Sequence, residues 1–194
     1  IHVPRAPHAR FAGTSAHGVR GDVIHQLDAT VGTLLGELDR RGIASNTLVL
    51  FTSDNGGVLE DGYLDGSTTN PGNHAFNGPL RGTKYQLYEG GHRVPFIARW
   101  PGRIAPGGVS SALLALPDLL ASLAALAGQP IPTDAARDSV NVLPALLGDA
   151  AASVRTNLVM QNNNATPLAV RAGAWKSLPA AGQLFRLDTD LAET

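Results

Sequence analysis

Apolar residues between positions 21 and 41 recur at intervals of three or four. This spacing predicts an amphipathic helix with one buried stripe, and Gly42 is well placed to end it. A leucine stripe over residues 116–127 predicts a second helix, with Pro117 in its first turn and Gly128 just beyond its end. We expect both stripes to lie in the core. The first consists of Val23, Ile24, Leu27, Val31, Leu34, Leu35 and Leu38.

A continuous apolar run over residues 48–51 stops abruptly at the sequence DNGG of residues 54–57. A run without alternation is typical of a strand covered on both faces, as in a parallel sheet between helices. A second run over residues 94–100 predicts another strand, in which Pro95 is poorly suited to a central position. Because a helix, a short turn and a strand follow one another, the pattern favours a layered α/β fold.

Short apolar segments alternate with polar or glycine-containing turns in the last third of the chain. This alternation predicts a small antiparallel sub-domain, reached through a proline-containing connector over residues 129–138 and a brief helical segment. We therefore expect two units, residues 1–130 and residues 131–194. The strands are predicted near residues 157–160, 167–178 and 183–188.

Composition excludes several classes of function. The chain has 194 residues, a net charge of −1 and no cysteine. The charge offers no electrostatic reason to bind nucleic acid or an anionic membrane, and the absence of cysteine excludes disulfides and thiol chemistry. No apolar run approaches the roughly 20 residues of a membrane span. No signal peptide is recognisable, and because the chain opens on Ile1 we expect it to be the C-terminal part of a longer protein.

Asp54 and Asn55 follow the first predicted strand, where α/β sheets place their ligand chemistry. Their oxygens are hard donors of the kind that Ca²⁺ or Mg²⁺ prefers, although the same residues are also common in turns. The polar stretch over residues 57–79 is long for a loop without regular structure, so we expect it to line a pocket and to set substrate preference.

Other charged residues have a structural interpretation. A partly buried Glu89–Arg93 pair is expected to hold a glycine-rich turn. Lys176 and Arg171 lie in the predicted C-terminal strands, where solvent exposure is the expected state of both side chains.

The segment SDNG, followed by LRGTKYQLYEGGHRVPFIARWPGRIAPG, resembles the second half of the catalytic domain of sulfatases, the arylsulfatase family. Further blocks follow the family's order: HVP, LDATVGTLLGELDRRGIASNTLVLFTSDNGG, LPDLLASLAALAG, AVRAGAWK and LFRLDTDLAET. The resemblance implies that residues 1–130 are the C-terminal portion of an alkaline-phosphatase-like α/β/α domain. Residues 131–194 would then be the small antiparallel sub-domain that packs against its sheet.

The resemblance also implies an activity, the hydrolysis of sulfate monoesters, and a set of site residues. Asp54 and Asn55 match metal ligands of the family. Lys84 and His2 match catalytic residues that contact the sulfate group and the leaving oxygen, and His74 is a further candidate for substrate binding. The expected substrate is a sulfated small molecule or a sulfated carbohydrate. A periplasmic, secreted or lysosomal location is implied in the same way.

The implied cofactors are Ca²⁺, or Mg²⁺, and a formylglycine made from Cys or Ser in a Cys/Ser-x-Pro-x-Arg motif. This chain contains neither a cysteine nor a Ser-x-Pro-x-Arg motif, so we expect the formylglycine in a missing N-terminal part. The family's first pair of metal carboxylates is absent as well. With half of the ligands missing the ion should bind poorly, and we predict that this chain by itself is inactive.

Two alternatives to a sulfatase stay open at this point. One is a phosphonate or phosphodiester hydrolase of the same superfamily, because both classes cleave charged tetrahedral esters with a metal-held nucleophile. The other is a non-catalytic, sulfatase-like module. Retention of Asp54, Asn55, Lys84 and His2 together argues against the second alternative, because a dead pocket has no physical reason to keep four polar groups.

Overall fold

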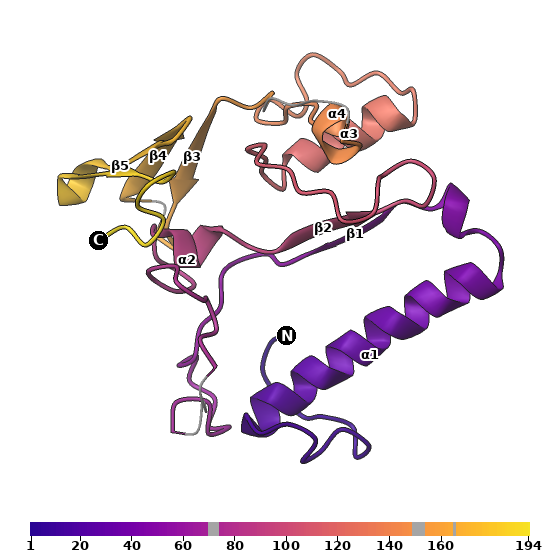
Figure 1. The fold of residues 1–194 in the computed structure, drawn as a ribbon. Helices are drawn as coiled ribbons and strands as arrows, with labels where there is room; N and C mark the ends of the chain where they lie inside the picture. Colours follow the sequence, from indigo (N-terminus) through magenta and orange to yellow (C-terminus); the bar gives the residue numbers. More distant parts are fainter. Residues whose placement is uncertain (70–73, 149–153, 165) are drawn as a thin grey trace.

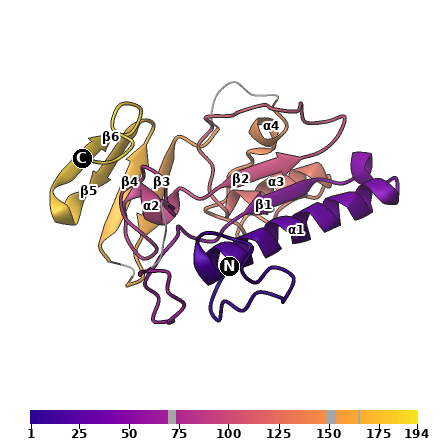
Figure 2. The same ribbon diagram turned by 60° about the horizontal axis from the view of Figure 1, so that its bottom comes forward.

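The computed structural model describes residues 1–69, 74–148, 154–164 and 166–194. A two-stranded ribbon, β1 and β2, lies between helix α1 on one side and helices α3 and α4 on the other (Figure 1). The C-terminal sheet stands beside this layered part, with the short helix α2 next to it (Figure 2). The bounds are α1 Gly18–Arg40, β1 Val49–Thr52, α2 Glu89–His92, β2 Phe96–Arg99, α3 Asp118–Leu126 and α4 Leu143–Leu146.

Helix α1 ends where the sequence predicts. Gly42 has a φ of +68°, a conformation that favours glycine, and its N–H donates to Asp39 O at 3.0 Å. The next N–H, that of Ile43, donates to Leu38 O at 3.1 Å. These two bonds satisfy carbonyls that would otherwise be unpaired at the helix end. The chain is thereby turned toward the short 3₁₀ segment Ala44–Asn46 and β1.

Strand β1 pairs antiparallel with β2, although a run without alternation is typical of strands in a parallel sheet. Val49 lies opposite Arg99 and Thr52 opposite Phe96. All four residues of β1 are half-buried and none is fully covered. An apolar run reports that a strand is covered, but it does not report the direction of its neighbour.

The C-terminal sheet confirms the predicted antiparallel sub-domain. Its order is β3-β4-β5-β6, and each strand pairs antiparallel with the next. The main buried cluster lies on this sheet and includes one residue of the preceding loop, Leu87. The bounds are β3 Asn157–Gln161, β4 Leu168–Ala172, β5 Trp175–Leu178 and β6 Gln183–Arg186; the other cluster members are Met160, Ala169, Leu178, Phe185 and Leu187.

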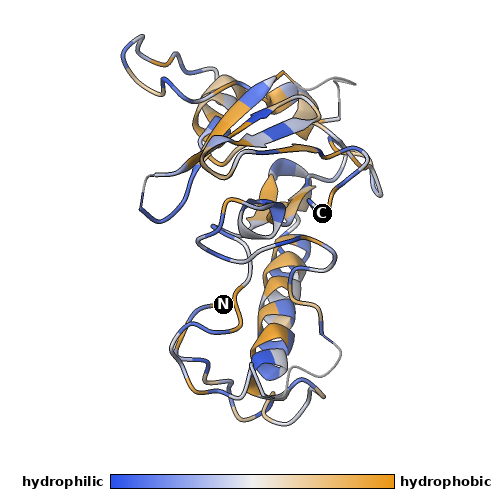
Figure 3. Ribbon diagram, turned by 90° about the vertical axis from the view of Figure 1, so that its left-hand side faces the viewer, coloured by the Kyte–Doolittle hydropathy of each residue, from blue (hydrophilic) through white to orange (hydrophobic). Residues whose placement is uncertain are grey.

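The leucine stripe of α3 is not in a core, contrary to expectation. Leu120 is 57% exposed and Leu123 is 41% exposed, and Leu34 on α1 is 62% exposed. Figure 3 shows hydrophobic residues along α1 with hydrophilic ones between them. Helix α3 lies against α4, but these leucine side chains remain exposed within the part of the chain that the structure describes. None of the described helices is both long enough and apolar enough to cross a lipid bilayer.

Candidate functional site

The loop that follows β1 carries the two predicted metal ligands. Asp54 is exposed and Asn55 is half-buried. The Asn55 side chain donates from Nδ2 to Gly56 O at 3.0 Å, and this bond orients the amide and leaves its Oδ1 available as a ligand. Ser53 Oγ donates to Asn55 O at 3.0 Å, which holds the turn. A carboxylate and an amide oxygen are thus presented at the end of the strand.

Backbone hydrogen bonds join this loop to the segment that carries Lys84. The Lys84 N–H donates to Gly57 O at 3.0 Å, and the Gly56 N–H donates to Gly91 O at 2.9 Å. Asn77 adds a side-chain bridge, because its Oδ1 accepts from the Gly57 N–H at 2.9 Å. Two segments far apart in sequence therefore form one unit. A methyl group on Gly56 would lie 1.7 Å from a backbone oxygen, so only glycine permits this approach.

Lys84 is half-buried, and its Nζ lies 5.2 Å from the centroid of the Tyr85 ring. Tyr85 has a φ of +77°, so the turn at this point is an uncommon one for a residue with a side chain. No ion pair between Lys84 and Asp54 occurs among the residues described. The structure brings the Lys84 main chain to the metal-ligand loop, and the roles of these side chains stay predictions.

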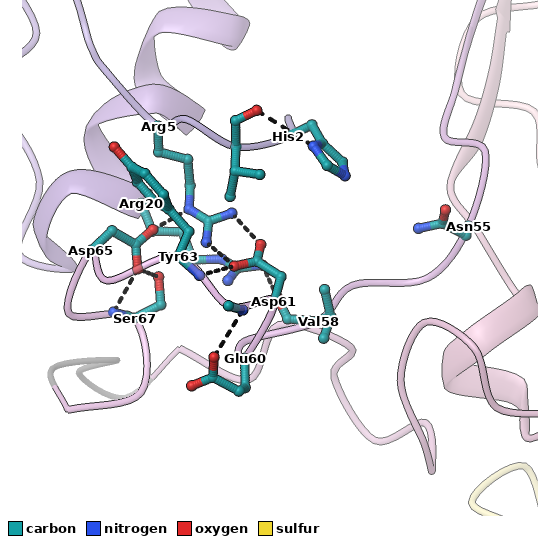
Figure 4. Close-up of polar contacts among 12 residues, drawn as sticks. His2, Arg5, Arg20, Asn55, Val58, Glu60, Asp61, Tyr63, Asp65 and Ser67 are labelled. Atoms are coloured by element: carbon teal, nitrogen blue, oxygen red, sulfur yellow. Dashed lines mark hydrogen bonds and ion pairs between the residues drawn. The ribbon is translucent and has the colours of Figure 1, made fainter.

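The two predicted histidines lie elsewhere. His2 is exposed near the first residue, and Figure 4 draws it without a contact to Asn55. His74 is exposed, and its ring centroid lies 5.5 Å from that of His17. Neither histidine is bonded to Asp54 or Lys84 in the described ranges of the chain. The role of His74 therefore depends on the cavity that it lines, and the role of His2 depends on how its segment is anchored.

A cavity of about 110 Å³ opens between the start of α1 and the polar loop over residues 57–79. The loop contributes Leu59, Ser67 and His74 to the lining of this cavity, and its expected part in substrate preference stays a prediction. Helix α1 contributes a half-buried residue, Arg20, whose guanidinium donates to Val58 O at 2.5 Å. Burial lowers the pKa of Arg20, and the nearby charge of Arg5 lowers it further. The remaining lining residues are Ser15, His17, Gly21, Ile24 and His25.

Arg5 anchors the His2 segment to the polar loop, an arrangement the sequence did not predict (Figure 4). Its guanidinium bonds to Asp61 at 2.8 and 3.1 Å and also to Asp65. The Arg5 and Asp65 side chains are each 2% exposed. Burial alone would raise the pKa of Asp65, but bonds from Arg5 and Ser67 outweigh it and lower the pKa to about 2. Partners about 60 residues apart leave no local pattern by which to find them.

This depressed pKa predicts acid sensitivity of the polar loop. A carboxyl group whose pKa is lower in the folded state stabilises that state above its ordinary pKa of 3.8, and the stabilisation is lost as pH falls toward 2. The loss is on the order of 2 kcal/mol from Asp65. Urea unfolding of the full-length protein at pH 5.5 and at pH 2.5 measures it, and Asp65→Asn should lose less stability over this interval than the wild type. An equal loss would contradict the prediction.

A second buried ionic cluster corrects the expectation for Lys176. Its side chain is 0% exposed, and its Nζ lies 3.0 Å from Glu89 Oε1 and 2.9 Å from Glu193 Oε1. Arg93 Nε pairs with Glu89 Oε2 at 2.6 Å, which confirms the predicted Glu89–Arg93 pair. Burial would raise the pKa of Glu89, but Lys176 and Arg93 outweigh it and hold the pKa below its ordinary value. Arg171, also expected in solvent, is half-buried.

The two donors have the chemistry of ligands for a hard divalent cation. Ca²⁺ takes roughly six to eight oxygen ligands, and Asp54 with Asn55 supplies two side chains of the appropriate chemistry. Within the described ranges no group of three or more His, Cys, Asp or Glu side chains is placed to hold a metal. A complete site would need further carboxylates from outside these residues.

Comparison with known proteins identifies the family to which the chain is similar. The sulfatase family model matches residues 2–129. The N-acetylgalactosamine-6-O-sulfatase of Bacteroides thetaiotaomicron is 49% identical over 176 residues, and the match covers 91% of this chain and 34% of that protein. The steryl-sulfatase of Rattus norvegicus is 39% identical over 148 residues, covering 76% of this chain and 25% of that protein. The chain thus spans about a third or less of these curated relatives.

A solved structure agrees with the sequence matches. It comes from work on the metabolism of multiple glycosaminoglycans by Bacteroides thetaiotaomicron, is 44% identical to this chain, and superposes with a TM-score of 0.91. The superposition covers 100% of this chain and 44% of that one. It confirms the predicted fold, part of an alkaline-phosphatase-like α/β arrangement followed by a small antiparallel sheet. Because the family model also matches well over half of its residues, this chain belongs to the sulfatase family.

Proposed function

We propose that this chain supplies one part of an enzyme that hydrolyses sulfate monoesters. The observation that carries the proposal is the bond from the Lys84 N–H to Gly57 O. That bond attaches the segment bearing an ammonium group to the loop bearing Asp54 and Asn55. An anionic tetrahedral group needs cationic and metal-held contacts on several sides, and this junction is suited to provide them from two segments.

The chain's own residues would act mainly through charge and position. Asp54 and Asn55 would hold a divalent cation, Ca²⁺ or Mg²⁺, which when bound acts as a Lewis acid and orients the sulfate oxygens. Lys84 would stabilise the negative charge that builds on the leaving oxygen as the S–O bond breaks. In a half-buried position its ammonium would stabilise that charge more strongly than it would in bulk water. His2 would donate a proton to that oxygen.

The remaining chemistry would come from a segment outside this chain. Sulfatases are generally metal-dependent and use a formylglycine, and the residues present include no precursor motif for it. We assign residues 1–130 to the C-terminal portion of the catalytic domain and residues 131–194 to the C-terminal sub-domain. The apolar side chains of α1 and α3 that stay exposed are consistent with further elements packing on them.

We propose a sulfated carbohydrate as the substrate. The similar proteins include an N-acetylgalactosamine-6-O-sulfatase and a solved structure from work on glycosaminoglycans, although a steryl-sulfatase is also similar. The cavity lined by His74 and Arg20 lies along the same loop that continues from Asn55. Asn55 and the lining residue Leu59 are four residues apart and so at most about 14 Å apart, which places the edge of this cavity within reach of a sugar bound at the reaction site. We assign His74 a substrate-binding role there.

The test is an ester hydrolysis assay on the full-length protein and on the isolated 194 residues. The full-length protein should hydrolyse an aryl or sugar sulfate, and the isolated chain should show no turnover because it lacks the nucleophile and half of the metal ligands. Paired phosphate monoester, phosphonate and phosphodiester substrates serve as controls. Turnover by the isolated chain, or a full-length protein that cleaves only phosphorus esters, would contradict the proposal.

A further inference from the structure

The segment over residues 81–93, which carries Lys84, is fastened to the C-terminal sheet by buried polar contacts. Glu193, next to the last residue, is 0% exposed. Its Oε2 accepts from the Glu89 N–H at 2.5 Å, and its main-chain oxygen accepts from Arg81 Nη1 at 2.6 Å. Its Oε1 accepts no hydrogen bond and is neutralised by the Lys176 ammonium at 2.9 Å.

Lys176, on strand β5, joins Glu89 and Glu193 in this buried cluster, and we call these three residues the clamp. The same ammonium reaches Glu89 Oε1 at 3.0 Å, so one cation holds two carboxylates that come from different parts of the chain. Arg93, whose side chain is 40% exposed, pairs with Glu89 at the edge of the cluster, so two positive and two negative charges balance there. Buried charges arranged in this way tolerate little displacement, because each must keep its partner or remain unpaired away from water.

Apolar and aromatic contacts hold the same segment in place. Leu87 lies in the buried cluster of the C-terminal sheet, and the Tyr88 hydroxyl donates to Gln183 Oε1 at 3.0 Å. The Arg81 guanidinium lies 4.0 Å from the centroid of the Tyr88 ring. The segment is therefore fixed at residue 81 and over residues 87–89. Lys84 occupies the short span between these anchors.

From this geometry we infer that Glu193 and Lys176 are positioning residues for Lys84: the C-terminal sub-domain sets where the site's ammonium stands. The inference rests on the proposed function, in which Lys84 contacts the sulfate ester. The clamped segment meets the loop of Asp54 and Asn55 at the hydrogen bond from the Lys84 N–H to Gly57 O. Misplacement by about 1 Å of a group that must match a transition state costs up to about 100-fold in rate.

A double-mutant cycle in the full-length protein tests this inference. Glu193→Gln should lower kcat for a sulfate ester by about 10- to 100-fold, with a smaller change in KM. In a Lys84→Ala background the same substitution should change kcat by no more than about 2-fold, because the group it positions is already gone. Asp188→Asn is the matched control; this carboxylate belongs to an exposed pair with Arg186 and should leave kcat unchanged.

Amide hydrogen exchange provides a readout that does not depend on activity. Glu193→Gln should speed exchange over residues 81–93 and leave β3 and β4 unaffected. If Glu193→Gln does not fold, Arg81→Met removes the hydrogen bond to Glu193 O and the guanidinium over the Tyr88 ring from an exposed position, and it should change kcat and exchange in the same direction by a smaller factor.

Two results would overturn the inference. One is a set of kcat effects that multiply in the double mutant, and the other is faster exchange throughout the C-terminal sheet, since both indicate general destabilisation. A wild type without sulfate ester turnover would instead remove the proposed function, and the exchange comparison would still decide whether the clamp exists.

Discussion

Replacement of Lys84 by alanine in the full-length protein is expected to lower kcat for a sulfate ester by about 10²- to 10³-fold, the loss typical of removing one preorganised charge-stabilising group. The effect on KM should be smaller, because the ammonium matters most when negative charge has built on the leaving oxygen. Steady-state kinetics with esters of different leaving alcohols measures the loss, which should be largest for the most basic alcohol.

Two companion variants sharpen the result. Lys84→Arg keeps the charge but replaces a compact ammonium with a planar guanidinium, so it should recover only part of the activity. Arg103→Ala removes an exposed cation beyond strand β2 and should leave kcat unchanged. A loss for Lys84→Ala no larger than that for Arg103→Ala would remove the lysine from the site.

Replacement of Lys176 by methionine is expected to lower the free energy of unfolding by about 3–5 kcal/mol. Methionine fills similar space, but it leaves the carboxylates of Glu89 and Glu193 buried without their common cation. Strand β5 and the segment over residues 81–93 would then lose their ionic connection. Denaturant unfolding of the full-length protein, followed by circular dichroism, measures the change.

Two controls test whether this loss comes from the unpaired buried charges: neutralising both carboxylates, and breaking an ion pair on the surface. Adding Glu89→Gln and Glu193→Gln to Lys176→Met should restore part of the stability, because the buried charges that lost their partner are removed. Arg186→Ala breaks a pair whose side chains are 55% and 47% exposed, and it should cost less than about 1 kcal/mol. If Lys176→Met is no more costly than Arg186→Ala, the buried cluster does not stabilise the fold.

Local patterns in the sequence were sufficient to predict the two longest helices and the C-terminal strands. The three- and four-residue spacing of apolar positions indicated α1 and α3, and the glycines at residues 42 and 128 marked their ends. The short apolar segments indicated three stretches of C-terminal strand, and the second of them contains both β4 and β5. The Glu89–Arg93 pair could also be predicted, because partners four residues apart need only one helical turn to meet.

Contacts between distant segments could not be predicted in this way. Arg5 reaches Asp61 and Asp65, and Lys176 reaches Glu89, across 56 to 87 residues. A lone lysine in a strand is normally solvated, so the sequence around Lys176 gave no sign that its side chain is buried. The direction of β2 against β1 and the exposure of the α3 leucines likewise depend on what lies beside each element.

The amino-acid sequence by itself determined the kinds of element, the family resemblance and the residue types available for chemistry, because these depend on neighbours within a few positions. Only the tertiary structure decided that the Lys84 segment is bonded to the loop of Asp54 and Asn55, and that the last residues of the chain hold it there. The physical reason is that the free energy of burying a charged side chain depends on the partners that it meets in the folded state. Those partners are brought together by the whole fold rather than by adjacency in the chain.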